Sequence, residues 1–155
     1  MKRLLFLGKS EKGMSLAMWA VLIPVFIFMA GLILDFGRLF LAQQELQNVM
    51  DASTLAAANT GVTINDGLNP PYCVLPTPDA PNALNTFFND NMAPMAADGI
   101  TIQEQLINDG IGDSLYADGK VSLKVRISIP MMFGKLWGLD FWETTRTSWS
   151  QCYPV

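Results

Sequence analysis

The sequence predicts an α+β fold: one long N-terminal helix crosses a membrane, continues beyond it as an amphipathic helix, and packs on a small extracytoplasmic domain with a C-terminal antiparallel β-sheet. Three observations support this fold. Residues 14–34 carry no charge, and residues 38–60 continue a helical pattern without proline or glycine. Residues 120–129 alternate strictly between polar and apolar side chains, which is typical of a strand.

The composition of the 155 residues favours a single domain and argues against several classes of function. A net charge of −4 opposes nucleic-acid binding, which needs a basic face. The chain has no histidine, the commonest general base and metal ligand, and it contains neither a serine-centred catalytic motif nor a glycine-rich phosphate loop. We therefore expect no enzymatic activity, no catalytic residues, no bound metal and no cofactor.

The uncharged run at residues 14–34 predicts a membrane helix. Its 21 residues would span roughly 31 Å at 1.5 Å per residue, about the thickness of the hydrocarbon core. Residues 1–13 carry a net charge of +3 and residues 14–155 a net charge of −7, so the positive-inside rule places the N-terminus in the cytoplasm. A cleaved secretory signal is the alternative, but the run is long for one and Asp35 follows it instead of a small-residue cleavage site.

The helix is expected to continue outside the membrane through residues 35–60 and to stop at Gly61. Small or apolar side chains recur there at steps of three and four and form a narrow packing stripe: Leu39, Ala42, Leu46, Val49, Met50 and Ser53. This stripe needs a partner, which is either the protein's own C-terminal domain or another subunit.

Residues 12–58 resemble the TadE/TadG-like pilus-assembly family. The segment reads KGMSLAMWAVLIPVFIFMAGLILDFGRLFLAQQELQNVMDASTLAAA. The family pattern is a glycine, an apolar helix with a central proline, then Asp-x-Gly-Arg, a Leu-Gln pair and Asp-Ala-x-x-Leu-Ala-x-Ala. The matching positions of this chain are Gly13, Pro24, Asp35, Gly37, Arg38, Leu46, Gln47, Asp51 and Leu55. Residues 121–141 are similar to the C-terminal part of these proteins, in a weaker match.

The resemblance implies a pilin-like structural subunit or assembly factor of a Tad/Flp-type pilus or secretion system, related to type IV pili. It implies a single-pass protein of the bacterial inner membrane or of a surface pilus, in a homo- or hetero-oligomer with other pilus or secretion subunits. TadE-like members can be cut by a prepilin peptidase after a glycine. Here the cut would fall between Gly13 and Met14. The fifth residue after this cut is Met18, where these proteins usually have a glutamate.

Longer TadG-like members add a metal-binding von Willebrand A domain, and residues 51–54 could be mistaken for part of its site. They lie on the predicted helix, where the family motif already accounts for them. A membrane-tethered extracytoplasmic adhesin or binding module, with its contacts in the acidic middle of the chain, is the alternative function.

These patterns divide the chain into a basic leader, a membrane helix, an extracytoplasmic helix and a small α+β domain: 1–13, 14–34, 35–60 and 61–155. Within the small domain, residues 60–119 hold eight acidic residues and no lysine or arginine, with frequent turn residues. This predicts loops with two short helices, at about 80–89 and 102–108. Residues 109–119 lack the ligand spacing of a calcium loop, and we interpret their acids as solvated turns.

The C-terminal part predicts two strands, at 120–129 and 141–151, with a further strand near 61–64 to help cover their apolar face. The apolar residues between the two strands, 131–142, have two interpretations. The favoured one is a core-filling hairpin; the other is an exposed patch that contacts the bilayer or a neighbouring subunit. Cys73 and Cys152 are expected to form a disulfide, because an extracytoplasmic compartment is oxidising.

Overall fold

The computed structural model describes residues 11–67, 70–108, 116 and 118–154. The elements, in chain order, are helix α1 (Glu11–Ala58), strands β1 (Val62–Ile64) and β2 (Tyr72–Val74), helix α2 (Asp79–Ala97), strands β3 (Thr101–Ile107) and β4 (Lys120–Pro130), the 3-10 helix η2 (Gly134–Trp137) and strand β5 (Phe141–Gln151). This confirms the predicted α+β class. Most of the expected leader and most of the acidic stretch 109–119 lie outside the described residues.

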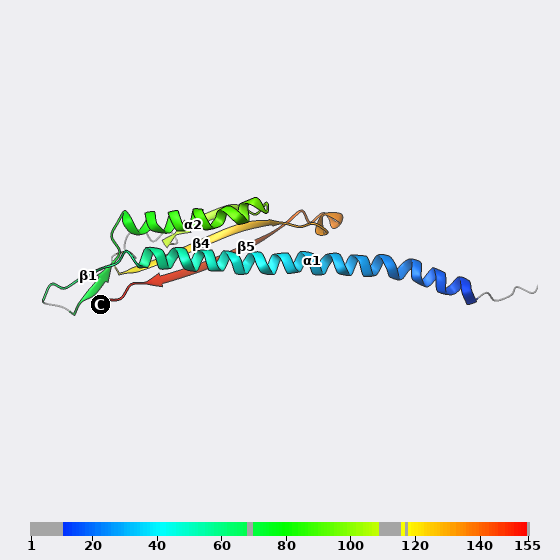
Figure 1. The fold of residues 1–155 in the computed structure, drawn as a ribbon, viewed down its shortest axis with the longest axis horizontal. Helices are drawn as coiled ribbons and strands as arrows, with labels where there is room; N and C mark the ends of the chain where they lie inside the picture. Colours follow the sequence, from blue (N-terminus) through cyan, green and yellow to red (C-terminus); the bar gives the residue numbers. More distant parts are fainter. Residues whose placement is uncertain (1–10, 68–69, 109–115, 117, 155) are drawn as a thin grey trace, which may run out of the picture.

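Helix α1 is one unbroken helix of 48 residues that passes through Pro24. By the helical rise it is roughly 72 Å long. Helix α2 and the strands lie alongside its C-terminal half, whereas its N-terminal half projects from the domain, shown in blue in Figure 1. The helix therefore belongs to the domain core at one end and stands free of the domain at the other.

Strands β3, β4 and β5 form an antiparallel sheet in that spatial order. The register pairs Lys120 with Gln151 and Pro130 with Phe141, so β4 and β5 form a hairpin along their whole length. The alternation predicted for β4 is seen in its burial, because its apolar side chains all face the core: Val121, Leu123, Val125, Ile127 and Ile129. One core joins these residues to buried side chains of α1 and α2.

The helix predicted at 102–108 is wrong, because this segment is strand β3. It pairs with β4 through a register that begins at Thr101 and Ser128 and contains one irregularity, between Ile102 and Glu104. The glutamine and glutamate residues of β3 have good helix propensity, but the free edge of β4 offers a full set of backbone partners. Pairing across the sheet overrides the weak local preference.

The helix predicted at 80–89 is longer than expected, because α2 continues to Ala97 and includes Pro94. Its buried side chains continue at helical spacing from the predicted part, with Leu84 and Phe88, past the predicted end, with Met92 and Met95. Burial of the two methionines offsets the hydrogen bond that the proline removes near the helix end. Gly99, at a φ of +80°, then turns the chain toward β3.

The strand predicted near 61–64 exists as β1, but it does not cover the C-terminal sheet. It pairs with β2 instead, Val62 with Val74 and Ile64 with Tyr72, in a separate two-stranded sheet. The apolar face of β4 is covered by the helices, so no further strand is needed there.

Candidate functional site: the exposed helix and its attachment to the domain

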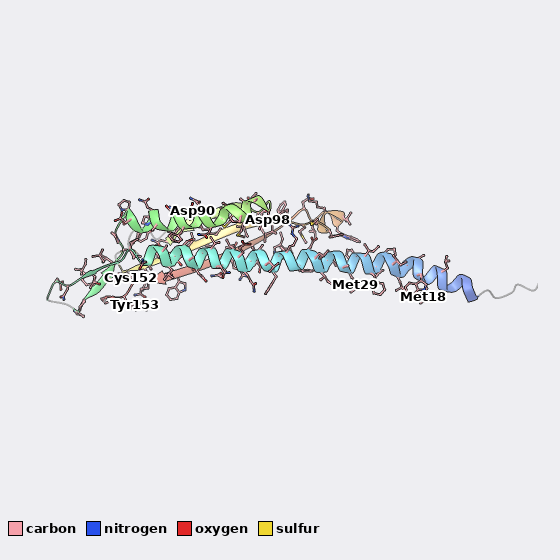
Figure 2. The ribbon with its side chains drawn as sticks, in the orientation of Figure 1. Met18, Met29, Asp90, Asp98, Cys152 and Tyr153 are labelled. Atoms are coloured by element: carbon pink, nitrogen blue, oxygen red, sulfur yellow. A yellow bond between two sulfur atoms is a disulfide. The ribbon has the colours of Figure 1, made fainter. Side chains whose placement is uncertain are left out.

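The N-terminal half of α1 presents apolar side chains on every side. We name residues 16–34 the anchor segment. Its large side chains are mostly exposed, and an 18-residue window of the helix is only 6% buried inside the molecule. Figure 2 shows Met18 and Met29 on this projecting part. By length and composition the helix can cross a membrane. Exposed apolar area of this extent is unfavourable in water, so the anchor segment requires an apolar partner.

The packing stripe on the second half of α1 is covered by the protein's own domain. Leu46, Met50 and Ser53 have no exposed surface, and Leu39, Ala42 and Val49 are also buried. Their neighbours are α2, β4 and β5. The sequence left two partners open for this stripe, the protein's own C-terminal domain or another subunit. In the structure the stripe packs on the C-terminal domain.

Asp35 attaches the end of the anchor segment to the domain. Its buried carboxylate accepts three backbone hydrogen bonds from the turn after β4, from Met132 N–H to Oδ1 at 3.0 Å and from Phe133 and Gly134 N–H to Oδ2 at 2.9 and 2.8 Å. Sequence reasoning identified Asp35 by the family motif alone. Its donors lie 97–99 residues away, which no local pattern indicates.

The carboxyl group of Asp35 is ionised at neutral pH. Burial raises the pKa of Asp35, but the three backbone donors and the positive charge of Arg38 lower it by more. The pKa of Asp35 therefore lies below the ordinary 3.8. A buried carboxylate is tolerated when it is fully hydrogen-bonded, and these donors supply that. The charge therefore holds the turn against α1.

Asp51 and Thr54, in the second half of the family motif, attach α1 to β5. Ser148 donates its hydroxyl proton to Asp51 Oδ1 at 2.5 Å, and Gln47 donates to the same oxygen at 2.8 Å. The Thr54 hydroxyl accepts from Ser150 at 3.0 Å and lies 3.2 Å from Ser148 Oγ. These side-chain hydrogen bonds thus join the motif on α1 to the last strand, β5.

The remaining motif residues lie on the surface of α1 and make few contacts. Pro24 and Gly37 are exposed, and a Cβ added at Gly37 would meet nothing within 4 Å. Arg38 is exposed beside a small hollow, and Leu55 is 65% exposed. Gly13 and the residue after it lie at the start of α1. The exposed positions Pro24, Gly37, Arg38 and Leu55 are accessible for contacts outside the chain.

A disulfide joins Cys73 to Cys152 across a sequence separation of 79, with Cα atoms 5.9 Å apart. It links β2 to the residue that follows β5, at the end of the molecule opposite the anchor segment (Figure 2). Gly61 packs against it so closely that an added Cβ would lie 2.7 Å from the Cys73 sulfur. The bridge thus holds together the C-terminal end of α1, β2 and the end of β5.

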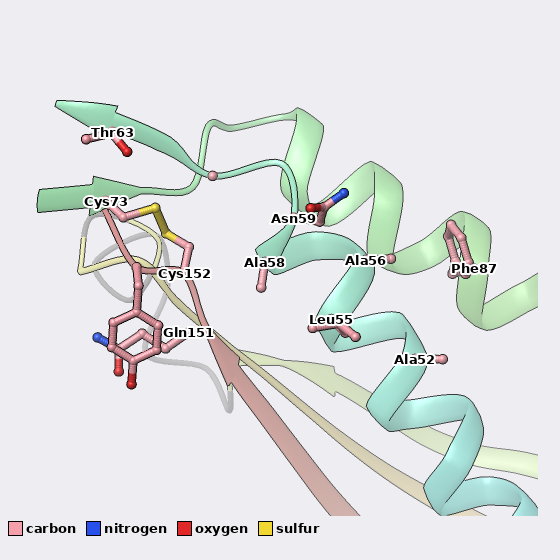
Figure 3. A pocket seen from close by; sticks show the side chains of 12 residues that line it. Ala52, Leu55, Ala56, Ala58, Asn59, Thr63, Cys73, Phe87, Gln151 and Cys152 are labelled. Carbon is pink, nitrogen blue, oxygen red and sulfur yellow. A yellow bond between two sulfur atoms is a disulfide. The ribbon is translucent and has the colours of Figure 1, made fainter. Parts of the chain in front are cut away.

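A groove of about 660 Å³ lies beside the disulfide, along the last turns of α1. Its walls include the small side chains Ala52, Ala56 and Ala58, and the larger Leu55 and Phe87 (Figure 3). The lining is mostly apolar and the groove is open to the outside. Small residues along a helix allow another segment to approach its backbone closely.

The connection between β4 and β5 forms an apolar surface at the other end of the domain. We name residues 131–142 the apolar tip. The favoured interpretation, a core-filling hairpin, is wrong for most of it, because six large side chains are 46–78% exposed: Met132, Leu136, Trp137, Leu139, Phe141 and Trp142. Of the large apolar side chains of the tip, Met131 alone is buried, and Phe133 is half-buried and packs on Gly31. The tip leaves the core because Asp35 holds its turn beside the projecting part of α1.

Comparison with known proteins gives one match. The Tad family model, described as Flp pilus-assembly TadE/G-like, matches residues 13–60. No curated protein and no solved structure matches the chain. The family match covers α1 and contains Asp35 and Asp51, whose hydrogen-bond partners in the apolar tip and β5 lie outside it.

Proposed function

We infer, from the match of residues 13–60 to the Tad pilus-assembly family, that the protein is a membrane-anchored, pilin-like structural subunit or assembly factor of a Tad/Flp-type pilus or secretion system. It acts by association, without catalysis. Its partners are the membrane and other subunits of the same apparatus, in a homo- or hetero-oligomer.

One observation in the structure supports this proposal: a single helix changes environment along its length. The anchor segment is exposed and apolar, whereas the stripe from Leu39 to Ser53 is the core of a folded domain. A membrane anchor joined by a flexible linker would need no such continuity. A continuous helix transmits the orientation of the domain to the anchor segment, which is the property that a subunit of an ordered assembly requires.

The two motif aspartates fix that orientation. Asp35 and Asp51 are 16 residues apart, about 24 Å along the helix at 1.5 Å per residue. One contacts the apolar tip and the other contacts β5. Two attachments at this separation prevent α1 from rotating or sliding on the domain. The part of α1 between these two residues is therefore held in one orientation on the domain.

The proposed topology follows the charge distribution. Residues 1–13 would lie in the cytoplasm, residues 14–34 in the inner membrane, and residues 35–155 outside. The disulfide supports the same orientation, since such bonds persist in oxidising compartments.

Processing by a prepilin peptidase between Gly13 and Met14 is part of this proposal. Both residues lie in the first turns of α1, and helix ends open readily. The intact mass of protein purified from native cells tests it, with Gly13→Val as the variant expected to stay uncut. A wild-type chain that still begins at Met1 would contradict processing, without affecting the proposed role in assembly.

Co-purification tests the assembly role. Full-length protein is recovered from membranes in mild detergent, and its partners are identified by mass spectrometry. We expect pilus or secretion subunits of the same apparatus. Repeated recovery of the protein alone would contradict the proposal.

Matched variants test the anchor in the same preparation. Ile23→Asp with Ile27→Asp places two charges in the anchor segment, each costing about 3 kcal/mol at the centre of a membrane helix. Leu55→Asp with Val62→Asp places two charges at comparably exposed positions of the domain. We expect only the first pair to leave the membrane fraction. Equal behaviour of both pairs would contradict anchoring by residues 14–34.

A further inference from the structure

We propose that the apolar tip is a second membrane contact, which lies in the extracytoplasmic leaflet of the bilayer beside α1. The proposal rests on the membrane anchoring proposed above. It adds that the folded domain itself, and not the helix alone, enters the lipid.

The position of the tip along α1 is the first argument. The rings of Phe28 and Trp137 are in contact, with centroids 5.0 Å apart and planes inclined at 59°. Phe28 lies six residues before the end of the span at Leu34, roughly 9 Å inside it by the helical rise. Trp137 therefore reaches well below the membrane boundary when residues 14–34 fill the hydrocarbon core. Figure 1 shows this segment, in orange, extending along α1 toward its N-terminal half.

The chemistry of the exposed side chains is the second argument. The tip exposes two tryptophans, one phenylalanine, two leucines and one methionine: Trp137, Trp142, Phe141, Leu136, Leu139 and Met132. Its charged residues are Lys135 and Asp140. Tryptophan is enriched at the level of lipid headgroups, and a lysine can extend its ammonium group from apolar surroundings to the phosphates. This is the composition of an interfacial membrane contact.

The backbone of the tip is the third argument, because lipid cannot satisfy exposed peptide groups. Asp35 accepts the N–H groups of residues 132, 133 and 134. The N–H groups of Met131, Leu136, Gly138 and Leu139 are donated to carbonyl oxygens within residues 133–140. These seven N–H groups are thus bonded within the protein itself and do not depend on water. The carboxylate that completes this set belongs to the anchoring helix.

The continuity of the tip with the anchor segment identifies lipid as its occupant. Phe133 packs so closely on Gly31 that a Cβ at this glycine would lie 2.6 Å from the ring. The tip therefore packs directly on Phe28 and Gly31, and its exposed apolar side chains adjoin those of the anchor segment. The medium that surrounds this part of the anchor segment also surrounds the tip, and for a protein held in the inner membrane that medium is lipid.

Quenching of tryptophan fluorescence in full-length protein, reconstituted in phosphatidylcholine bilayers, tests the proposal. The chain has four tryptophans, so three variants each retain one. The Trp137 variant carries Trp19→Phe, Trp142→Phe and Trp149→Phe, and the other two variants retain Trp19 or Trp149 in the same way. Trp149 is the matched control, since it is 71% exposed against 66% for Trp137 but lies eight residues beyond Phe141, about 27 Å along β5.

We expect phosphatidylcholine brominated on its acyl chains to quench most of the Trp137 emission, whereas acrylamide in the aqueous phase quenches it weakly. Trp149 should show the reverse pattern. Trp19, inside the anchor segment, should be quenched by brominated lipid. Far-ultraviolet circular dichroism identical to that of the wild type verifies that each variant is folded.

The outcomes separate the two proposals. Trp19 quenched by brominated lipid, with Trp137 quenched only by acrylamide, overturns the tip contact and leaves the anchor intact. Trp137 protected from both quenchers indicates a protein partner, such as a second copy, and also overturns the tip contact. Trp19 unquenched by brominated lipid overturns the anchor and with it this inference.

Discussion

Replacement of Asp35 by asparagine should weaken the attachment of the apolar tip to α1. The carboxylate is buried and accepts three backbone hydrogen bonds at 2.8–3.0 Å. Asparagine has the same shape, but one of its two terminal atoms becomes a donor. Whichever way the amide turns, at least one N–H group of residues 132–134 then faces an N–H donor instead of an acceptor.

The size of the effect follows from these contacts. A hydrogen bond to a charged group contributes about 1.5–3 kcal/mol, and a buried donor left unpaired costs about 1–3 kcal/mol. Part of this is offset, because the variant no longer buries a charge. We expect Asp35→Asn to lower the free energy of unfolding by about 2–4 kcal/mol at neutral pH.

The assay is urea unfolding of the full-length protein in detergent micelles, combined with hydrogen exchange at residues 132–134. Exchange there should accelerate in Asp35→Asn. Glu45→Gln is the matched control, because it removes an exposed carboxylate from the same helix. We expect this control to change the free energy of unfolding by less than about 0.5 kcal/mol.

The pH dependence gives an independent check. The folded pKa of Asp35 lies below its ordinary value of 3.8, so the ionised group stabilises the folded state above that value. This contribution is lost as the pH falls through the lower, folded pKa. Wild type should therefore lose stability on acidification more steeply than Asp35→Asn. Equal acid sensitivity of the two proteins, together with unchanged exchange at residues 132–134, would refute this reasoning.

Two further predictions use pairs of positions in the same chain. Gly31→Ala should destabilise the protein by about 1–3 kcal/mol in thermal unfolding, because the added Cβ would lie 2.6 Å from the Phe133 ring. Gly37→Ala, whose Cβ would meet nothing within 4 Å, should stabilise the protein by up to about 1 kcal/mol, and the same sign of change for both variants would contradict this packing. Reduction of the disulfide should lower the free energy of unfolding, measured in urea, by about 4 kcal/mol, a value set by the length of the loop that the bond closes. The double variant Cys73→Ser with Cys152→Ser should not respond to reductant. An unchanged urea midpoint of unfolding for the reduced wild type would contradict this prediction.

The elements that the sequence predicted correctly are those with long, regular local patterns. The uncharged run and the stripe from Leu39 to Ser53 predict α1 almost to its last residue. The alternation of residues 120–129 predicts β4 and its buried face. Burial of one face repeats with the period of the element, so a window of neighbouring residues contains enough information.

The errors occur where distant segments decide the structure. Strand β3 exists because β4 has a free edge, and β1 pairs with β2 instead of the larger sheet. The apolar tip is rich in large apolar side chains and is therefore expected to fill the core, yet it lies outside the core because the turn that begins it is held by a carboxylate on α1. None of these partners is near in sequence.

The same division applies to the candidate site. The sequence by itself determined that one helix carries both an apolar membrane segment and a packing stripe, and its resemblance to a family singled out Asp35 and Asp51. Only the tertiary structure decided what these aspartates hold, which is the turn at residues 132–134 and Ser148, each about a hundred residues along the chain. The physical reason is that apolar periodicity is a property of neighbouring residues. A hydrogen bond depends on where the fold brings a distant donor, within a few tenths of an ångström.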